Sequence, residues 1–416
     1  MDLVTRPPRI SEIKVKFNAK EEYGRLSPVG HGTRVYNVES VEMPRSLTSD
    51  SDIVSSTRSL VNKYQPDLIE NLRVVYYSYD YEGSETSRIR ESVGLPIKIV
   101  NEMVAGRVLR DHLIERLQNM MTLRPRLFMS AWLQIVKCHY FIWECGVQHS
   151  DISEGNVMYR SKGNGIYGVL NDWDLATIRD RKDHGGLERT GSMPFMSLHL
   201  LTEEYWNGAI KRLYRHELES LIWLLPWVAL NYSSGKYRLN NKVKYWITGN
   251  YTLCREDKGD FLSFLCEFCT EGLWQDMRPI IGKPLSWLVR FRANHNLTLV
   301  DNPGGWIEPD NQSLYHEIMD MVVAVMARFP DISVPAPRED IPVDYRRPPT
   351  PPLLAMISLP GLWRVAGGLS KPQTYLMRIH VTIRKQMTPD PPLNRDPLVC
   401  PDVCTLREDQ GCRLLH

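Results

Sequence analysis

The chain has 416 residues, of which 43% are hydrophobic and 24% are charged, so it is long enough for two or three domains with a sizeable core. Lys and Arg number 51 against 49 Asp and Glu, and this balance excludes a global field that favours nucleic acid or an anionic membrane. The start, MDLVTRPPRI, lacks the apolar stretch of a secretory signal, and the longest apolar run, Leu221–Leu230, is too short to span a bilayer. We therefore expect a globular protein with neither nucleic-acid nor membrane partners.

Eight cysteines stand at irregular spacings that do not form a disulfide framework. Cys266 and Cys269 form a CxxC motif inside Gly259–Trp274, whose pattern predicts a helix. A zinc site would need a second pair at matching spacing, so metal binding by these cysteines is not expected. The thiols indicate a reducing compartment, the cytoplasm or the nucleus.

The first part of the chain is rich in β-prone residues. Residues 1–25 are mixed and charged, and Leu26–Val41 carries Gly30 and Gly32 between β-prone residues, which predicts a hairpin. Val74–Tyr81 alternates as a strand does, and Arg107–Leu123 predicts one or two further strands.

From Arg126 onward the apolar spacing becomes helical. Arg126–Gly146 predicts a helix that ends at its glycine, and Tyr167–Ala176 predicts a strand that runs into a turn. The segment Tyr214–Leu230 is hydrophobic around most of its circumference, so we expect a helix buried on all sides. Later helices are predicted in Gly259–Trp274, Lys283–Leu297 and Ser313–Phe329, and a proline-dense linker follows residue 340.

A short polar loop, HSDISEGN, separates the first of these helices from the next strand. Asp151 lies in this loop, and Asn156 follows it by five positions. Asp172 ends the following apolar strand, and Asp174, two positions later, points the same way in extended chain. An amide and one or two carboxylates at strand ends suit Mg²⁺, which completes its coordination with water and phosphate. Asp151 is then placed to accept or orient a hydroxyl proton.

This order of residues matches the catalytic apparatus of protein kinases. The segment Glu188–Leu201, ERTGSMPFMSLHLL, resembles the stretch that closes a kinase activation segment, and HELESLIWLLPWVAL resembles the buried helix that follows it. Together with HYFIWECGVQHSDISEGNVM and GVLNDWDLA, these motifs resemble the fungal-type protein kinase family. The resemblance covers Arg126–Tyr232 well and Gly24–Leu123 loosely.

The resemblance implies an α+β, two-lobed protein-kinase-like fold with a small β-rich N-lobe and a larger helical C-lobe. It divides the chain into an N-terminal extension (1–25), an abbreviated N-lobe (26–123), a C-lobe (124–340) and a proline-rich linker with a weakly ordered tail (341–416). It also implies ATP and Mg²⁺ as cosubstrate and cofactor, and phosphoryl transfer to a protein Ser/Thr hydroxyl. The sequence gives no prediction of oligomeric state.

Residue by residue, the resemblance gives Asp151 the position of the catalytic base, and it makes Asn156 and Asp172 the metal ligands. Gly30 and Gly32 take the loop that covers the phosphates. Lys63 takes the position of the lysine that contacts ATP and serves catalysis.

The carboxylate that pairs with this lysine is open. Glu70 is the best-placed candidate and Glu85 is the second. The interval after Lys63 is short for an ordinary helix, loop and strand, so the helix is abbreviated or a block is missing.

Some positions depart from the usual kinase pattern. Ser150 stands where arginine is usual beside the base, and Ser153 stands where many Ser/Thr kinases have lysine. Asp174 replaces the expected glycine of the metal motif, and His199 replaces the glutamate that closes the activation segment.

Two alternatives remain open from the sequence. A small-molecule phosphotransferase of the aminoglycoside-kinase type also uses His-x-Asp-x-x-x-x-Asn with an Asp-Trp-Asp metal motif, but it lacks a segment like RTGSMPFMS. A catalytically impaired pseudokinase that acts as a scaffold is favoured by the abbreviated N-lobe, whereas the retained Asp151, Asn156 and Asp172 argue against it.

Overall fold

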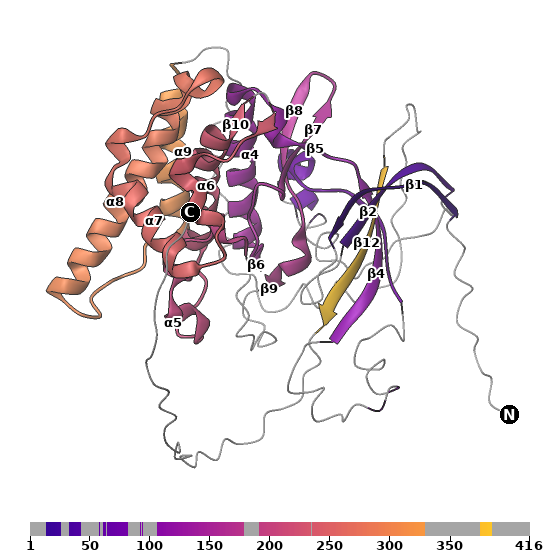
Figure 1. Cartoon of the computed structure of the whole chain (residues 1–416), viewed down its shortest axis with the longest axis horizontal. Coiled ribbons are helices and arrows are strands. Elements are labelled where there is room, and N and C mark those ends of the chain that lie inside the picture. The colour runs from indigo at the N-terminus through magenta and orange to yellow at the C-terminus, as the bar shows by residue number, and fades with distance from the viewer. Residues whose placement is uncertain are drawn as a thin grey trace, which may run out of the picture. The chain divides into compact units, whose positions relative to one another are not determined.

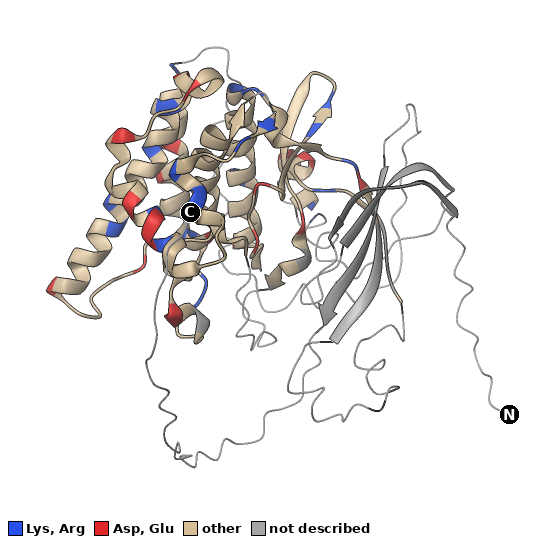
Figure 2. Ribbon diagram, in the orientation of Figure 1, with Lys and Arg blue, Asp and Glu red and all other residues tan. Residues whose placement is uncertain are grey.

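The computed structural model describes residues 14–25, 33–42, 58, 61–63, 65–81, 92, 94, 106–178, 191–233, 235–328 and 375–384 (Figure 1). All of them lie in the first of two units, Met1–Lys385, and the second unit is Gln386–His416. Figure 2 shows basic and acidic residues interspersed along the described helices. Among the described residues, no helix is both long enough and apolar enough to cross a membrane.

The helices predicted from apolar spacing are present, with one exception given below. The described helices are α4 (Pro125–Glu144), α6 (Tyr214–Asn231), α7 (Tyr251–Ser263), α8 (Arg278–Asp301) and α9 (Asn311–Met326), together with the short α5 (Glu203–Trp206), which was not predicted. Short 3₁₀ turns connect them: η1 (Pro66–Asn71), η2 (Met120–Thr122), η3 (Trp173–Leu175), η4 (Met193–Phe195), η5 (Leu198–Leu201), η6 (Asn241–Ile247), η7 (Leu265–Glu267) and η8 (Gly272–Met277).

Helix α4 lies at the centre of the core. It begins with Pro125, whose missing N–H costs nothing in the first turn, and Gly146 follows its end at a φ of 88°. Trp132 is fully buried and its indole N–H donates to the Leu221 carbonyl of α6 at 2.8 Å. Helix α6 is buried on all sides, as its composition predicts, so α4 and α6 form a rigid base for the loops they flank.

Small sheets frame the polar loop that follows α4. Strand β7 (Val157–Lys162) pairs with β8 (Gly165–Leu170) and β5 (Gln118–Asn119), and β6 (Val147–Gln148) pairs with β9 (Thr177–Ile178). Strand β8 packs closely on α4, because a Cβ added at Gly168 would lie 2.1 Å from the Ala131 carbonyl oxygen. A separate hairpin joins β10 (Tyr232–Ser233) to β11 (Lys236–Tyr237).

The largest sheet has five antiparallel strands in the order β1-β2-β12-β4-β3. Its strands are β1 (Lys14–Arg25), β2 (Thr33–Glu42), β3 (Val75–Asp80), β4 (Gly106–Glu115) and β12 (Tyr375–Arg384). Strand β12 pairs on one side with β2 and on the other with β4, so a segment beyond α9 occupies the middle of the sheet. The mixture of helix and strand agrees with the α+β prediction, while the two-lobed layout and the domain boundaries stay predictions.

The prediction of one helix over Gly259–Trp274 is wrong. Helix α7 starts earlier, where the Asn250 side chain accepts a hydrogen bond from the Leu253 N–H at 3.0 Å, and it ends at Ser263. The rings of Phe261 and Phe268 lie 5.7 Å apart, whereas residues seven apart in a continuous helix are separated by about 10 Å along the axis. The break therefore lets Phe268 fold back into the core, and it leaves Cys266 in η7.

Candidate active site

The polar loop, residues 149–156, meets the turn that carries Asp172. Strand pairing places Val157 opposite Leu170, so Asn156 and Asn171 lie at the same end of the β7–β8 hairpin. The Asn171 N–H donates to the Asn156 carbonyl at 2.7 Å. The structure thus brings together the two segments that the sequence assigned to catalysis and metal binding.

His149 ties the loop to the same turn. Its buried ring has Nε2 2.8 Å from the Asn171 carbonyl oxygen and Nδ1 3.3 Å from the Asp151 amide nitrogen. Because a carbonyl only accepts and an amide N–H only donates, Nε2 carries the proton and the ring is neutral. Burial lowers the pKa of His149, in agreement with this tautomer, although the Glu217 carboxylate acts in the opposite direction.

Both oxygens of the Asp151 carboxylate accept hydrogen bonds, one of them from a hydroxyl. Its Oδ2 accepts from the Asn156 amide at 3.2 Å, and its Oδ1 accepts from the Ser192 N–H at 2.8 Å and the Ser192 hydroxyl at 3.0 Å. The carboxylate is therefore oriented to accept a hydroxyl proton, the task of a general base. The sequence analysis did not single out Ser192 as a site residue, because its contact with Asp151 depends on the course of the chain between them.

Ser150 and Asp172 are strained at the backbone. Their φ values of 69° and 64° make them the two non-glycine residues with positive φ among the described residues. Such conformations cost of order 1–3 kcal/mol each and persist where the surrounding structure imposes them. Ser150 precedes the predicted base and Asp172 is itself a predicted metal ligand, so the strain agrees with a functional site at this loop and turn.

The donor set here fits a hard cation. Asn156 uses its amide nitrogen on the Asp151 carbonyl at 2.7 Å, which turns its amide oxygen away from Asp151. Within the described part of the chain, no cluster of three or more His, Cys, Asp and Glu side chains could hold a metal. The assignment of Asn156 and Asp172 as ligands of Mg²⁺ stays a prediction from the sequence. The Asp174 side chain lies outside the described residues.

Glu217 of α6 anchors the polar loop through the backbone of the loop. It is fully buried, and its carboxylate accepts the backbone N–H groups of His149 at 3.1 Å and Ser150 at 2.7 Å. The ring of His139 on α4 lies 2.6 Å from the same carboxylate, and Arg212 forms an ion pair with it at 3.7 Å. This arrangement, the Glu217 network, fixes the positive φ of Ser150.

Burial alone would raise the pKa of Glu217, but the hydrogen bond and charge of His139, with Arg212 and His149, lower it to about 2. Glu217 is thus ionised in the fold. Glu217 belongs to the HELES stretch, which was identified only by resemblance, yet an acidic residue in a helix buried on all sides needs buried donors.

Near the end of the segment that follows Ser192, His199 contacts His216 of α6, and both rings are neutral. Nδ1 of His199 lies 3.0 Å from Arg215 Nη2 and 3.1 Å from His216 Nε2, and the other ring nitrogen of His216 accepts from the Leu213 N–H at 3.0 Å. Burial and the Arg215 charge lower the pKa of His199 to about 4. His199 Nδ1 therefore serves as an acceptor for Arg215 and His216.

Of the residues predicted to contact the nucleotide or the ATP-binding lysine, the structure describes only some. Gly30, Gly32 and Glu85 lie outside the described residues. Lys63 is exposed, and Glu70 forms ion pairs with Arg160 and Lys162.

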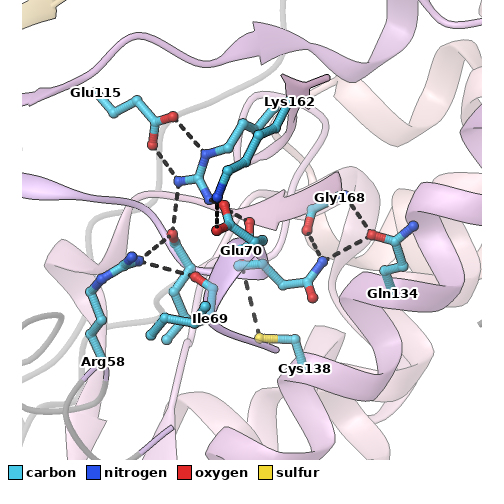
Figure 3. Close-up of polar contacts among 11 residues, drawn as sticks. Arg58, Ile69, Glu70, Glu115, Gln134, Cys138, Lys162 and Gly168 are labelled. Carbon is cyan, nitrogen blue, oxygen red and sulfur yellow. Dashed lines mark hydrogen bonds and ion pairs between the residues drawn. The ribbon is translucent and has the colours of Figure 1, made fainter. Parts of the chain in front are cut away.

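Glu70 contacts β7, as Figure 3 shows. Its carboxylate pairs with Arg160 at 2.9 Å and with Lys162 at 2.6 Å. Arg160 also donates to Glu115 and to the Leu72 carbonyl, and these contacts form the Arg160 network. The Lys63–Glu70 pair stays a prediction from the sequence.

Comparison with protein families shows what the chain resembles. The family described as fungal protein kinase matches residues 33–229, a range that contains the polar loop, Asp172, Ser192 and Glu217. A search of curated proteins gave no match. The resemblance stated from the sequence motifs is confirmed by this match, which covers residues 33–229.

Proposed function

We propose that the protein is an ATP-dependent protein Ser/Thr kinase that uses Mg²⁺. The observation that carries this proposal is the Ser192 hydroxyl, which donates to Asp151 Oδ1 at 3.0 Å. A carboxylate that accepts a hydroxyl in this way can orient an acceptor hydroxyl of a protein substrate. The segment 191–201 gives that substrate a surface which small-molecule phosphotransferases lack.

In the proposed reaction, the acceptor oxygen attacks the γ-phosphorus of ATP while the bond from this phosphorus to the β–γ bridging oxygen breaks, and ADP leaves. Asp151 orients the hydroxyl and takes up its proton. Asn156 and Asp172 would hold Mg²⁺, which when bound neutralises charge on the phosphates. Glu217 keeps Asp151 in place by fixing the backbone that precedes it.

Lys63 and the loop with Gly30 and Gly32 keep their proposed nucleotide contacts. Glu70, which also pairs with Arg160 and Lys162, stays the first candidate for the carboxylate beside Lys63, and Glu85 stays the second. We also propose a cytoplasmic or nuclear location.

A thermal-shift titration tests the nucleotide site. ATP with Mg²⁺ at one hundred times its Kd should stabilise the fold by about 2.7 kcal/mol through mass action. Asp172→Asn should abolish this Mg²⁺-dependent stabilisation, while Asp276→Asn, at an exposed position, should retain it. Unaltered stabilisation of the Asp172→Asn protein would show that Asp172 is not the metal ligand.

A transfer assay with Asp151→Asn tests the acceptor side. Nucleotide affinity should stay within a few-fold, and transfer to a protein substrate should fall at least about a hundredfold. Nucleotide binding without any transfer by the unaltered protein would favour the scaffold alternative. Transfer to an aminoglycoside hydroxyl but to no protein would favour the small-molecule alternative.

A further inference from the structure

The segment Gly191–Leu201, here called the platform segment, has a buried side and an accessible side. Met193 and Pro194 are partly exposed, whereas Phe195, Met196 and Ser197 are buried. Buried backbone N–H and C=O groups must be paired, and this segment has only short 3₁₀ turns to pair them internally. Its remaining backbone groups therefore depend on side chains from the helices behind it.

Lys258 of α7 supplies one such partner. The side chain is fully buried, and its ammonium donates to the Met196 carbonyl at 2.8 Å. The same nitrogen lies 4.7 Å from the ring centroid of Trp223 and 5.4 Å from that of Trp246. Aromatic faces stabilise a cation removed from water, so these two rings hold the ammonium against the carbonyl.

Glu219 of α6 supplies the complementary partner two residues further along. Its Oε1 accepts the Leu198 N–H at 2.9 Å and the indole N–H of Trp223 at 3.0 Å. Trp223 is thus shared, because its ring faces Lys258 while its N–H binds Glu219. A buried cation and a buried anion hold a carbonyl and an N–H of the same short segment.

The ammonium remains charged in this setting at neutral pH. Burial lowers the pKa of Lys258 to about 8, while Cys254 of α7 and Glu219 of α6 act to raise it. Leaving either charge without its partner would cost the full penalty of a buried unsatisfied group, which makes the pair sensitive to substitution.

We propose that Lys258 and Glu219 act as a clamp which positions the platform segment for binding of the protein acceptor. The clamp holds Met196 and Leu198, and Met196 in turn donates its N–H to the Ser192 carbonyl at 3.3 Å. The position of Ser192 beside Asp151 therefore depends on Lys258, although α7 contributes no residue to the polar loop. This inference rests on the proposed kinase function, because it assigns the platform segment to acceptor binding.

Hydrogen exchange of the platform segment tests the clamp without an activity assay. Lys258→Met keeps the apolar stem between the two indoles and removes only the donor. Amide exchange in peptides covering 192–201 should become at least tenfold faster, while peptides from α4 stay unchanged. The matched control is Lys242→Met, which removes an exposed lysine that donates to the Glu267 carbonyl at 3.1 Å and should leave 192–201 unchanged.

Steady-state kinetics then separate positioning from general damage. Lys258→Met should raise KM for the protein acceptor at least tenfold while KM for ATP stays within twofold. Equal exchange and equal acceptor KM in Lys258→Met and the unaltered protein would overturn the clamp.

A second variant covers the case in which Lys258→Met does not fold. Glu219→Gln keeps an oxygen that accepts from Leu198 and Trp223 but removes the charge opposite Lys258. Exchange in 192–201 should become at least threefold faster, and unchanged exchange in this variant also overturns the clamp.

The two proposals fail in different ways. If the unaltered protein transfers no phosphate while exchange responds to Lys258→Met, the kinase function is wrong and the clamp stands as a structural feature. If phosphate is transferred and neither exchange nor acceptor KM responds, the clamp is wrong and the kinase function stands.

Discussion

In both the Glu217 network and the Arg160 network, several polar groups bind one buried charged side chain. The two networks have different structural roles. Glu217 is fully buried and receives two backbone N–H groups from adjacent residues of a single loop. Arg160 is 8% exposed and donates to groups from segments far apart in the sequence, including Glu70 and Glu115. One network therefore fixes the shape of a functional loop, and the other joins separate parts of the fold.

The environment of the partners also differs between the two networks. The side chains of Glu70 and Glu115 are 23% and 16% exposed, so water reaches them if Arg160 is removed. The N–H groups on Glu217 belong to His149 and Ser150, which are 0% and 3% exposed. Loss of the central charge should therefore cost more stability at Glu217, because its buried partners cannot bind water instead.

Removal of the Glu217 side chain should have the largest effect on stability. Glu217→Ala leaves His139 and two buried N–H groups without their acceptor and removes the carboxylate that pairs with Arg212. Breaking a buried charged pair costs about 3–5 kcal/mol. Denaturant unfolding should show this loss, whereas Glu256→Ala on an exposed face of α7 should change stability by less than about 0.5 kcal/mol. Similar costs for both variants would mean that Glu217 is not an anchor.

Removal of Arg160 should cost less. Arg160→Met keeps the apolar stem of the side chain, and the freed carboxylates can be hydrated, so we expect a loss of about 2–3 kcal/mol. The thermal shift with ATP and Mg²⁺ should survive, since the polar loop and Asp172 keep their own contacts. If Arg160→Met costs more than Glu217→Ala under the same conditions, exposure of the partners does not decide the difference.

Acid should distinguish the surroundings of α6 from the Arg160 network, because His149 contacts Glu217 and His199 contacts His216, both on α6. The described contacts of Arg160 include no histidine. The folded pKa of His149 lies below its unfolded value near 6.5, and that of His199 falls to about 4. Between these values the unfolded chain binds more protons, so the free energy of unfolding decreases as pH falls. The slope should approach about 1.4 kcal/mol per pH unit for each such histidine.

Urea unfolding at pH 7, 6 and 5 measures this slope. His199→Gln keeps a side-chain acceptor for Arg215 and should flatten the dependence, whereas Arg160→Met should leave it unchanged. A slope that is the same in all three proteins would show that His199 does not contribute.

The smallest effect is expected at the rim of the Arg160 network. Lys162 pairs with Glu70 at 2.6 Å, but its side chain is 64% exposed. Lys162→Met should lower stability by less than about 1 kcal/mol, and the difference should shrink further at 1 M salt. A loss as large as that of Arg160→Met would contradict the distinction between the buried centre and its exposed rim.

The sequence predicted the loop and turn of the site because their residues lie in short, ordered motifs. The roles of Asp151, Asn156 and Asp172 stay predictions, but the hairpin register does place Asn156 and Asn171, the neighbour of Asp172, at one end. Ser192 and the role of Glu217 were missed, since each acts through a partner distant in the chain.

The same reason explains the errors in the fold. Helix α7 ends at Ser263 because Phe268 packs back on Phe261, and local periodicity carries no information on such a return. The place of β12 between β2 and β4 is likewise set by pairing between remote segments.

The central position of β12 has a consequence for synthesis on the ribosome. Tyr375 pairs with Val38 and with Glu115, so both neighbouring strands are made long before the strand that joins them. Until then, β2 and β4 each present an unpaired edge, the kind of surface that recruits other chains. Sheets closed by such distant contacts form slowly, so nascent chains should spend their most aggregation-prone interval after α9 has emerged and before β12 has docked.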